Sequence, residues 1–158
     1  MLGIFLRFNV FNKSIPVIAT LVMLSACSSQ PLSSIPGLGS GPDINFDNQY
    51  LRGVFNWWEA SPAYRLSAGS NGWYVDVELI ADGQPYDFKL SDSLWTPNNT
   101  CGARYNGQSP LLQTPLYLIC GSDAQNLQFT PSTTGVYRFV FNPASGGEVQ
   151  LVISKIGS

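Results

Sequence analysis

Histidine is absent from the 158 residues of the chain, and charged side chains make up only 11% of them. The absence of histidine excludes the Ser-His-Asp and Cys-His systems that activate a nucleophile, and it excludes the usual zinc and iron sites. Eight basic side chains stand against ten acidic ones, so no basic stripe can follow the phosphates of a nucleic acid. A binding protein or an enzyme that works with carboxylates alone remains, and no cofactor is implied.

Aromatic side chains and turn-forming residues are abundant. The chain is 13% aromatic and contains 15 glycines and 11 prolines. Many turns between aromatic segments are typical of a β-rich domain. The length suits one domain, or one domain with a tail.

Residues 1–26 differ in character from the rest of the chain. Arg7 and Lys13 precede a short apolar run from Ile15 to Leu24. The run is shorter than the ~20 apolar residues that a spanning helix needs, but it has the size of a secretory signal core. It ends in Leu-Ser-Ala before Cys27, which resembles the lipobox of bacterial lipoproteins. The resemblance implies a cleaved signal peptide and an acylated Cys27.

The segment that follows is interpreted as a tether. Residues 27–45 are rich in Ser, Pro and Gly and carry no charge before Asp43. So little apolar surface cannot offset the entropy of ordering the segment. Acyl chains on Cys27 anchor such a protein to a lipid bilayer without a spanning helix. Lipoproteins kept at the inner membrane commonly have Asp after the cysteine, so Ser28 favours the outer membrane, on a face that the sequence leaves open.

Two further cysteines, Cys101 and Cys120, remain in the chain. An exported protein lies in an oxidising compartment, so the simplest expectation is one disulfide between them. A reactive thiol pair is the alternative, but the close CxxC spacing and a neighbouring base are both missing. A disulfide across a loop of this size contributes ~3 kcal/mol in the chain-entropy model.

Residues 46–158 alternate between short apolar runs and turn signals. In the run from Trp73 to Leu79 every second residue is apolar, and Asn-Gly and Asp-Gly pairs flank it. Such runs predict strands and hairpin turns. The predicted strands are 50–55, 73–79, 86–90, 116–119, 127–129, 136–141 and 148–153. About seven to eight short strands without a helical period predict an all-β, immunoglobulin-like sandwich.

Four short motifs occur in order between Gln49 and Thr100. They are Phe55-Asn56-Trp57-Trp58, Trp73 to Val77, Tyr86-Asp87-Phe88-Lys89, and Trp95. This series resembles the early-set immunoglobulin-like starch- and glycogen-binding modules that accompany pullulanases and branching enzymes. The resemblance implies a sugar platform at Trp58, Lys89 and Trp95, with Asn98 or Asn99 as its amide. An indole plane can pack on the apolar face of a pyranose ring, while lysine and asparagine supply hydrogen bonds at the rim.

Each tryptophan also has a structural interpretation. Trp57 and Trp58 are adjacent, so on an extended chain one is expected in the core and the other exposed. Trp73 is in phase with Val75 and Val77 and is expected in the core. The cysteine-closed loop 101–120 is not part of the family pattern, and it could cover the platform or form another contact surface.

The sequence therefore predicts a non-catalytic, lipid-anchored envelope protein whose head binds α-glucan or another envelope glycan. The acidic residues Asp76, Glu78, Asp82, Asp87 and Asp92 are interpreted as a solvated sandwich face, because no facing carboxylate pair is evident. The spacing of oxygen ligands that calcium requires is absent as well. Some members of the resembled family have lost sugar binding, so a scaffold or docking lipoprotein that binds a protein partner in an envelope assembly or secretion machine is the alternative.

Overall fold

The computed structural model describes residues 43–157 as an all-β sandwich, as the sequence predicted. The predicted signal peptide, the predicted lipidation site Cys27 and nearly all of the predicted tether lie outside the described residues. In the part described, the strands are β1 (Tyr50–Gly53), β2 (Ser67–Gly69), β3 (Gly72–Leu79), β4 (Tyr86–Ser91), β5 (Cys101–Gly102), β6 (Leu116–Cys120), β7 (Leu127–Phe129), β8 (Gly135–Pro143) and β9 (Val149–Ile156). The short 3-10 helices are η2 (Phe46–Asn48), η3 (Val54–Asn56), η4 (Pro62–Tyr64), η5 (Pro97–Asn99) and η6 (Ser145–Gly147).

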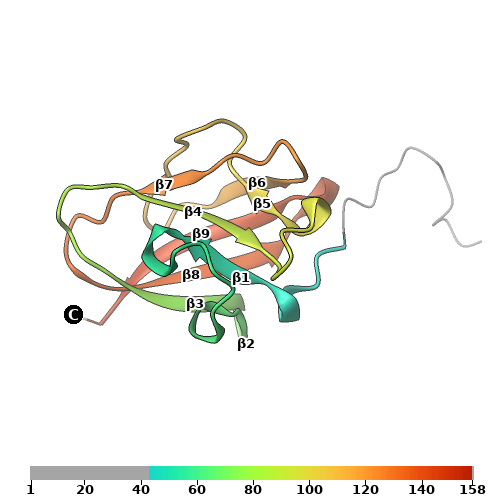
Figure 1. The fold of residues 1–158 in the computed structure, drawn as a ribbon. Coiled ribbons are helices and arrows are strands. Elements are labelled where there is room, and N and C mark those ends of the chain that lie inside the picture. Colours follow the sequence, from blue (N-terminus) through green and yellow to red (C-terminus); the bar gives the residue numbers. More distant parts are fainter. Residues whose placement is uncertain (1–42, 158) are drawn as a thin grey trace, which may run out of the picture. The chain divides into compact units, whose positions relative to one another are not determined.

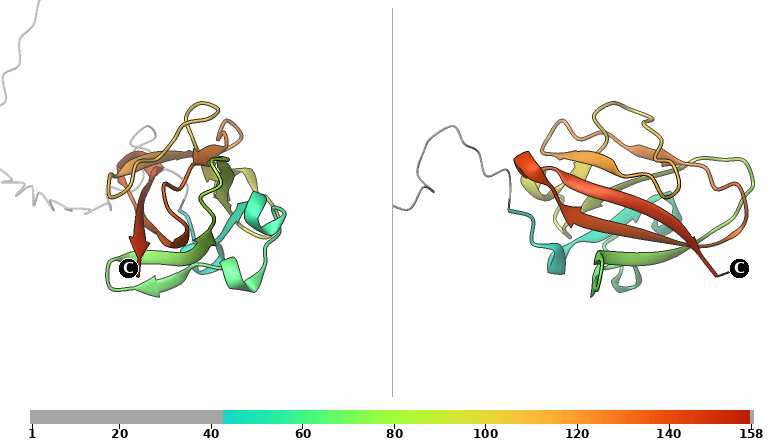
Figure 2. Two further views of the ribbon diagram at one scale, coloured as in Figure 1. Left: turned by 90° about the vertical axis from the view of Figure 1, so that its left-hand side faces the viewer. Right: turned by 180° about the vertical axis from the view of Figure 1, so that it is seen from behind.

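The strands form two antiparallel layers (Figure 1). β4 pairs with β1, β5 and β7 in the first layer, and β8 lies between β3 and β9 in the second, with β2 at its edge. β6 joins the layers because its first residues pair with β9 and its last two pair with β5. Figure 2 shows the second layer from behind, where β8 and β9 run along the domain.

Alternation of side chains along the strands builds the core between the layers. Val75, Val77 and Leu79 point inward from β3 as expected. They are joined by apolar residues of β1, β4, β7, β8 and β9. These residues are Leu51, Phe88, Leu90, Leu127, Phe129, Tyr137, Phe139, Phe141, Leu151 and Ile153. The ring edges of Phe88 and Phe129 meet Phe139 from the opposite layer. This aromatic centre accounts for part of the high aromatic content.

The expected disulfide is present between Cys101 and Cys120. The two residues are direct partners in the pairing of β5 with β6. The bond therefore crosses the seam where one layer passes into the other.

Two strand assignments from the sequence need correction. The strand predicted over 50–55 ends at Gly53, where the chain turns into η3. β2 (Ser-Ala-Gly) and β5 (Cys-Gly) were not predicted, because they contain no β-branched or large apolar residues that could mark an alternating strand pattern. No helix among residues 43–157 is long and apolar enough to cross a membrane.

Candidate functional site

The turn that follows β1 presents Trp57 and Trp58, and Asn56 holds it together. The buried Asn56 side chain accepts a hydrogen bond from the Gly53 amide at 2.9 Å, and it donates to the carbonyls of Leu51 at 2.9 Å and Glu59 at 3.2 Å. The Trp58 amide closes the turn on the Gly53 carbonyl at 2.9 Å. A single asparagine thus satisfies backbone groups on both sides of the turn.

This turn overturns the expectation for the adjacent tryptophans. The expectation assumed an extended chain, but both residues have left-handed backbone, with φ of 54° at Trp57 and 63° at Trp58. Neither side chain enters the core. Trp57 is 87% exposed, and Trp58 is half-buried at the surface.

A second loop, between β4 and β5, carries Trp95, and Asp92 organises this loop. The Asp92 carboxylate accepts hydrogen bonds from the amides of Leu94 at 3.1 Å and Thr96 at 2.9 Å, and from Asn99 Nδ2 at 3.0 Å. Burial alone raises the pKa of Asp92, but these hydrogen bonds to the charged form outweigh it, so the pKa lies below its ordinary value. Asp92 is thus a structural anchor and not part of a solvated face, which corrects the interpretation from sequence.

Arg52 links the two loops. Its side chain is only 6% exposed. Its Nε donates to the Trp58 carbonyl at 2.7 Å, and its Nη1 donates to the Asp92 carbonyl at 2.9 Å. The guanidinium also lies 3.8 Å from the centroid of the Trp95 ring, which is a cation–π contact. Burial lowers the pKa of Arg52, although Asp92 and Glu59 oppose that effect.

Trp58 and Trp95 consequently lie beside each other on the outer surface of the first layer. Their ring centroids are 6.2 Å apart, the planes are inclined by 42°, and Trp95 is 37% exposed. We call Trp58 and Trp95 the tryptophan platform. Trp57 belongs to the same turn and directly precedes Trp58 in the sequence.

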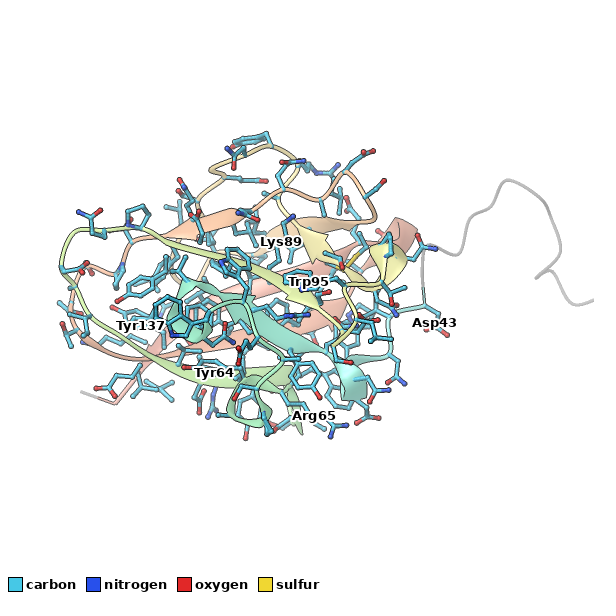
Figure 3. The ribbon with its side chains drawn as sticks, viewed as in Figure 1. Asp43, Tyr64, Arg65, Lys89, Trp95 and Tyr137 are labelled. Carbon is cyan, nitrogen blue, oxygen red and sulfur yellow. A yellow bond between two sulfur atoms is a disulfide. The ribbon has the colours of Figure 1, made fainter. Side chains whose placement is uncertain are left out.

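Lys89 lies next to Arg52 across the pairing of β1 with β4, and Figure 3 labels it on the same face as Trp95. Its Nζ donates to the Ala124 carbonyl at 2.7 Å, and burial lowers its pKa. One of its three donors is therefore used within the protein. Asn98 is exposed in η5, whereas the amide nitrogen of Asn99 is bound to Asp92.

The remaining tryptophan, Trp73, is at the edge of the core. It is partly buried and stacks on Phe46, with ring centroids 6.2 Å apart. This position agrees with the expectation that Trp73, which is in phase with Val75 and Val77, contributes to the core. Trp73 thus differs in environment from the two rings of the platform.

Left-handed backbone is concentrated at this site. Within residues 43–157 the non-glycine residues with positive φ are Trp57, Trp58, Trp95 and Gln113. Bulky side chains rarely adopt this conformation, which costs on the order of 1–3 kcal/mol at each position. Three of the four residues are the tryptophans of the two linked loops. Strain of this kind tends to collect where a side chain is held for a function.

Sequence reasoning missed the residues that build the site. Arg52 was assigned only to a strand, and Asn56 was noted only as part of a turn motif. Arg52 contacts two loops, and its partner Asp92 lies 40 residues further along the chain. These contacts depend on the register of β1 with β4, which no local pattern encodes. A signal was available for Asn56, because asparagine commonly bonds its own neighbouring backbone in turns.

The site has the chemistry of a binding surface. Two partly exposed indoles lie beside each other, and the guanidinium that contacts the Trp95 ring is engaged by backbone carbonyls. In the part of the chain described, no group of three or more Cys, Asp and Glu side chains is placed to hold a metal ion. Asp76, on the other layer, is engaged in two hydrogen bonds of 2.7 Å from Arg138.

The sequence matches no protein-family model, and no curated protein matches it. Among solved structures, the chain is similar to one described as the "Ligand induced structure of AmyP-SBD", with a TM-score of 0.46 and 19% sequence identity. That match covers 92% of this chain and 97% of the other.

Proposed function

We propose that the folded domain binds a glycan chain, with α-glucan as the first candidate, on the tryptophan platform. The observation that carries this proposal is the pair of neighbouring, partly exposed indoles in left-handed backbone, held together by Arg52. A large aromatic surface that only completed a core would need no such strain. The strain is understandable if the rings must face a ligand.

The physical chemistry of the platform suits a sugar. The C–H face of a pyranose packs on an indole plane, and rigid aromatic side chains give contact area at low entropic cost. The two Lys89 donors that are left and the exposed Asn98 amide are proposed to bind hydroxyl groups at the rim. Asn99 is proposed to act mainly by positioning Asp92, because its donor is already used there.

We propose that this binding is not coupled to catalysis. Hydrolysis of a glycosidic bond generally requires two carboxylates on either side of it. Near the platform, the Asp92 oxygens already accept three hydrogen bonds, and Asp76 is held by Arg138 on the other layer. Glu59 is exposed on the turn after η3, and a single carboxylate does not supply both roles.

The cellular setting is proposed from the sequence. A signal peptide over 1–26 and acylation of Cys27 would anchor the domain at the outer membrane through the 27–45 tether. Metabolic labelling with a radioactive fatty acid tests this point. We expect labelled wild-type protein and unlabelled Cys27→Ala protein.

The docking alternative is supported by a different surface. Tyr105 and Leu111, in the loop between β5 and β6, and Tyr117 in β6 are exposed. Exposed apolar residues of this kind can anchor a protein partner. If docking is the function, a pull-down from envelope extracts recovers one defined partner, and Leu111→Glu abolishes its recovery while Trp95→Ala does not.

Electrophoresis through native gels that contain soluble glycogen tests the proposed function. We expect glycogen to retard the wild-type protein, and we expect Trp95→Ala to migrate almost as in a glycogen-free gel. Phe substitution at Trp73 is the matched control, because it changes a tryptophan away from the platform, and it should be retarded like the wild type. Equal migration of the wild type with and without glycogen would exclude α-glucan as the ligand.

A further inference from the structure

A polar groove lies beside the tryptophan platform. Its volume is about 460 Å³, within the ~300–1,000 Å³ typical of small-molecule sites. One wall is formed by Asn48, Gln49 and Tyr50, and the other by Ser93, Leu94 and Asn99. The groove therefore lies between the start of β1 and the loop that carries Trp95.

The groove continues the surface of the platform. Tyr50 and Arg52 are two residues apart on β1, so their side chains leave the same face of the strand at a spacing of roughly 7 Å. Tyr50 lines the groove, and Arg52 lies under Trp95. Ser93 and Leu94 directly precede Trp95, and the carbonyl of Ser93 accepts from Arg52 at 3.4 Å. The same loop thus forms the wall of the groove and one ring of the platform.

One of the residues that line the groove, Gln49, carries a buried polar atom that lacks a partner. Gln49 is 1% exposed, and within residues 43–157 its Oε1 is buried and accepts no hydrogen bond. The Gln49 backbone is fixed, because its carbonyl accepts from the Leu66 amide at 2.9 Å. A buried acceptor without a partner costs free energy. A donor brought into the groove can recover that cost.

The charges around the groove favour a neutral ligand. The carboxylate of Asp92 is satisfied by three donors from its own loop. The guanidinium of Arg52 is bound to backbone carbonyls, so it does not offer a free cation to an anionic sugar. Amide and hydroxyl groups remain as recognition elements, and they pair with uncharged hydroxyls as donors and acceptors.

We infer that the groove is a second sugar subsite, and that the ligand is a chain of several neutral hexoses lying across the groove and the platform together. This inference rests on the proposed function. It adds that affinity depends on chain length, because a short oligosaccharide on the platform leaves the groove empty. Gln49 then acts as a hydroxyl acceptor, and Asn48 contributes at the outer rim.

Titration calorimetry with malto-oligosaccharides of two, four and seven glucose units tests the inference. For the wild type we expect affinity to rise from maltose to maltoheptaose. Gln49→Met keeps the length of the side chain and removes the acceptor, and we expect it to weaken maltoheptaose binding roughly fivefold, as the loss of one hydrogen bond implies. Maltose affinity should not change.

Two surface variants keep the test decisive if Gln49→Met does not fold. Asn48→Ala alters an exposed side chain of the groove and should also reduce the gain with chain length. Asn106→Ala alters an exposed asparagine of the β5–β6 loop and should bind every oligosaccharide as the wild type does.

The outcomes separate the inference from the proposed function. Two results would overturn the second subsite while leaving the platform intact. One is a wild-type affinity that is the same for all three oligosaccharides. The other is an increase in affinity with chain length that is as large in both groove variants as in the wild type. A wild type that binds none of the three oligosaccharides would refute α-glucan binding, and the inference with it.

Discussion

Trp57 illustrates at the scale of one residue how the site departs from ordinary folding preferences. Its side chain is 87% exposed, so little burial offsets its left-handed backbone. Glycine adopts this conformation without steric cost, whereas any L-residue with a Cβ atom does not. The stability of the fold therefore does not explain a tryptophan at this position, whereas a role for its exposed ring does.

Substitution of Trp57 by Gly and by Ala separates the ring from the strain. Both variants remove the indole, but only glycine relieves the left-handed backbone. We expect Trp57→Gly to have a free energy of unfolding about 1 kcal/mol higher than Trp57→Ala, after allowance for the larger entropy of the unfolded glycine chain. Urea denaturation followed by circular dichroism measures the difference. An alanine variant at least as stable as the glycine variant would contradict the assigned strain.

Asp92 makes the loop that carries Trp95 sensitive to acid. Its folded-state pKa lies below the ordinary value of 3.8, so its contribution to stability is complete above that value. It is lost as the pH falls through the lower pKa of the folded state. We expect Asp92→Asn to be less stable than the wild type at pH 6, with a gap that narrows towards pH 2. Urea denaturation across this range measures the gap, and a gap independent of pH would show that the carboxylate is not the anchor.

The residues that carry the site could be predicted only in part. Trp58 and Trp95 stand in recognisable motifs, and the structure brings them together. The positions of Arg52 and Lys89 depend on the pairing of β1 with β4, and the left-handed turn depends on hydrogen bonds from Asn56 to residues on both sides. The pairing of β1 with β4 joins residues far apart in the chain and leaves no periodic signal in the sequence, whereas the Asn56 hydrogen bonds are local. Contact of a ligand with any of the five candidate residues stays a prediction; these are Trp58, Lys89, Trp95, Asn98 and Asn99.

At the scale of elements, β5 and β6 form the seam of the sandwich. β5 has only two residues, yet it pairs with β4 on one side and with β6 on the other. The Cys101–Cys120 disulfide crosses this seam and closes a loop with a sequence separation of 19. The expected export and the count of two remaining cysteines predicted the bond, but the strand that carries Cys101, with only Cys and Gly, was not predicted.

Replacement of both Cys101 and Cys120 by alanine tests how much the disulfide contributes to stability. We expect the free energy of unfolding to fall by about 3 kcal/mol, since the unfolded chain regains the entropy of the open loop. Urea denaturation gives the value, and the wild type in reducing agent is the matched comparison. A double variant as stable as the oxidised wild type would contradict the role of the bond.

Longer elements were more predictable than short ones. β3 and β8 alternate cleanly and both were predicted as strands, and the inward residues of β3 form part of the core as expected. The strand predicted over 50–55 was too long, because Gly53 begins the turn that Asn56 closes. The local apolar pattern continues through Val54 and Phe55, so it does not reveal the end of the strand.

At the scale of the whole molecule, the described domain keeps its core apart from the proposed binding surface. The core between the layers holds the large inward-facing rings, such as Phe88, Phe139 and Tyr137. The platform and the groove lie outside it, on loops fixed by Arg52, Asn56 and Asp92. Loops on a rigid scaffold are a common place for recognition.

The tryptophan indole N–H signals in a nitrogen–proton NMR spectrum test the central claim most directly. The chain contains four tryptophans, so Trp73 at the edge of the core serves as an internal control for Trp58 and Trp95. On titration with maltoheptaose, we predict saturable shifts of the Trp58 and Trp95 signals and a Trp73 signal that stays in place. Unchanged Trp58 and Trp95 signals at saturating maltoheptaose would contradict the account.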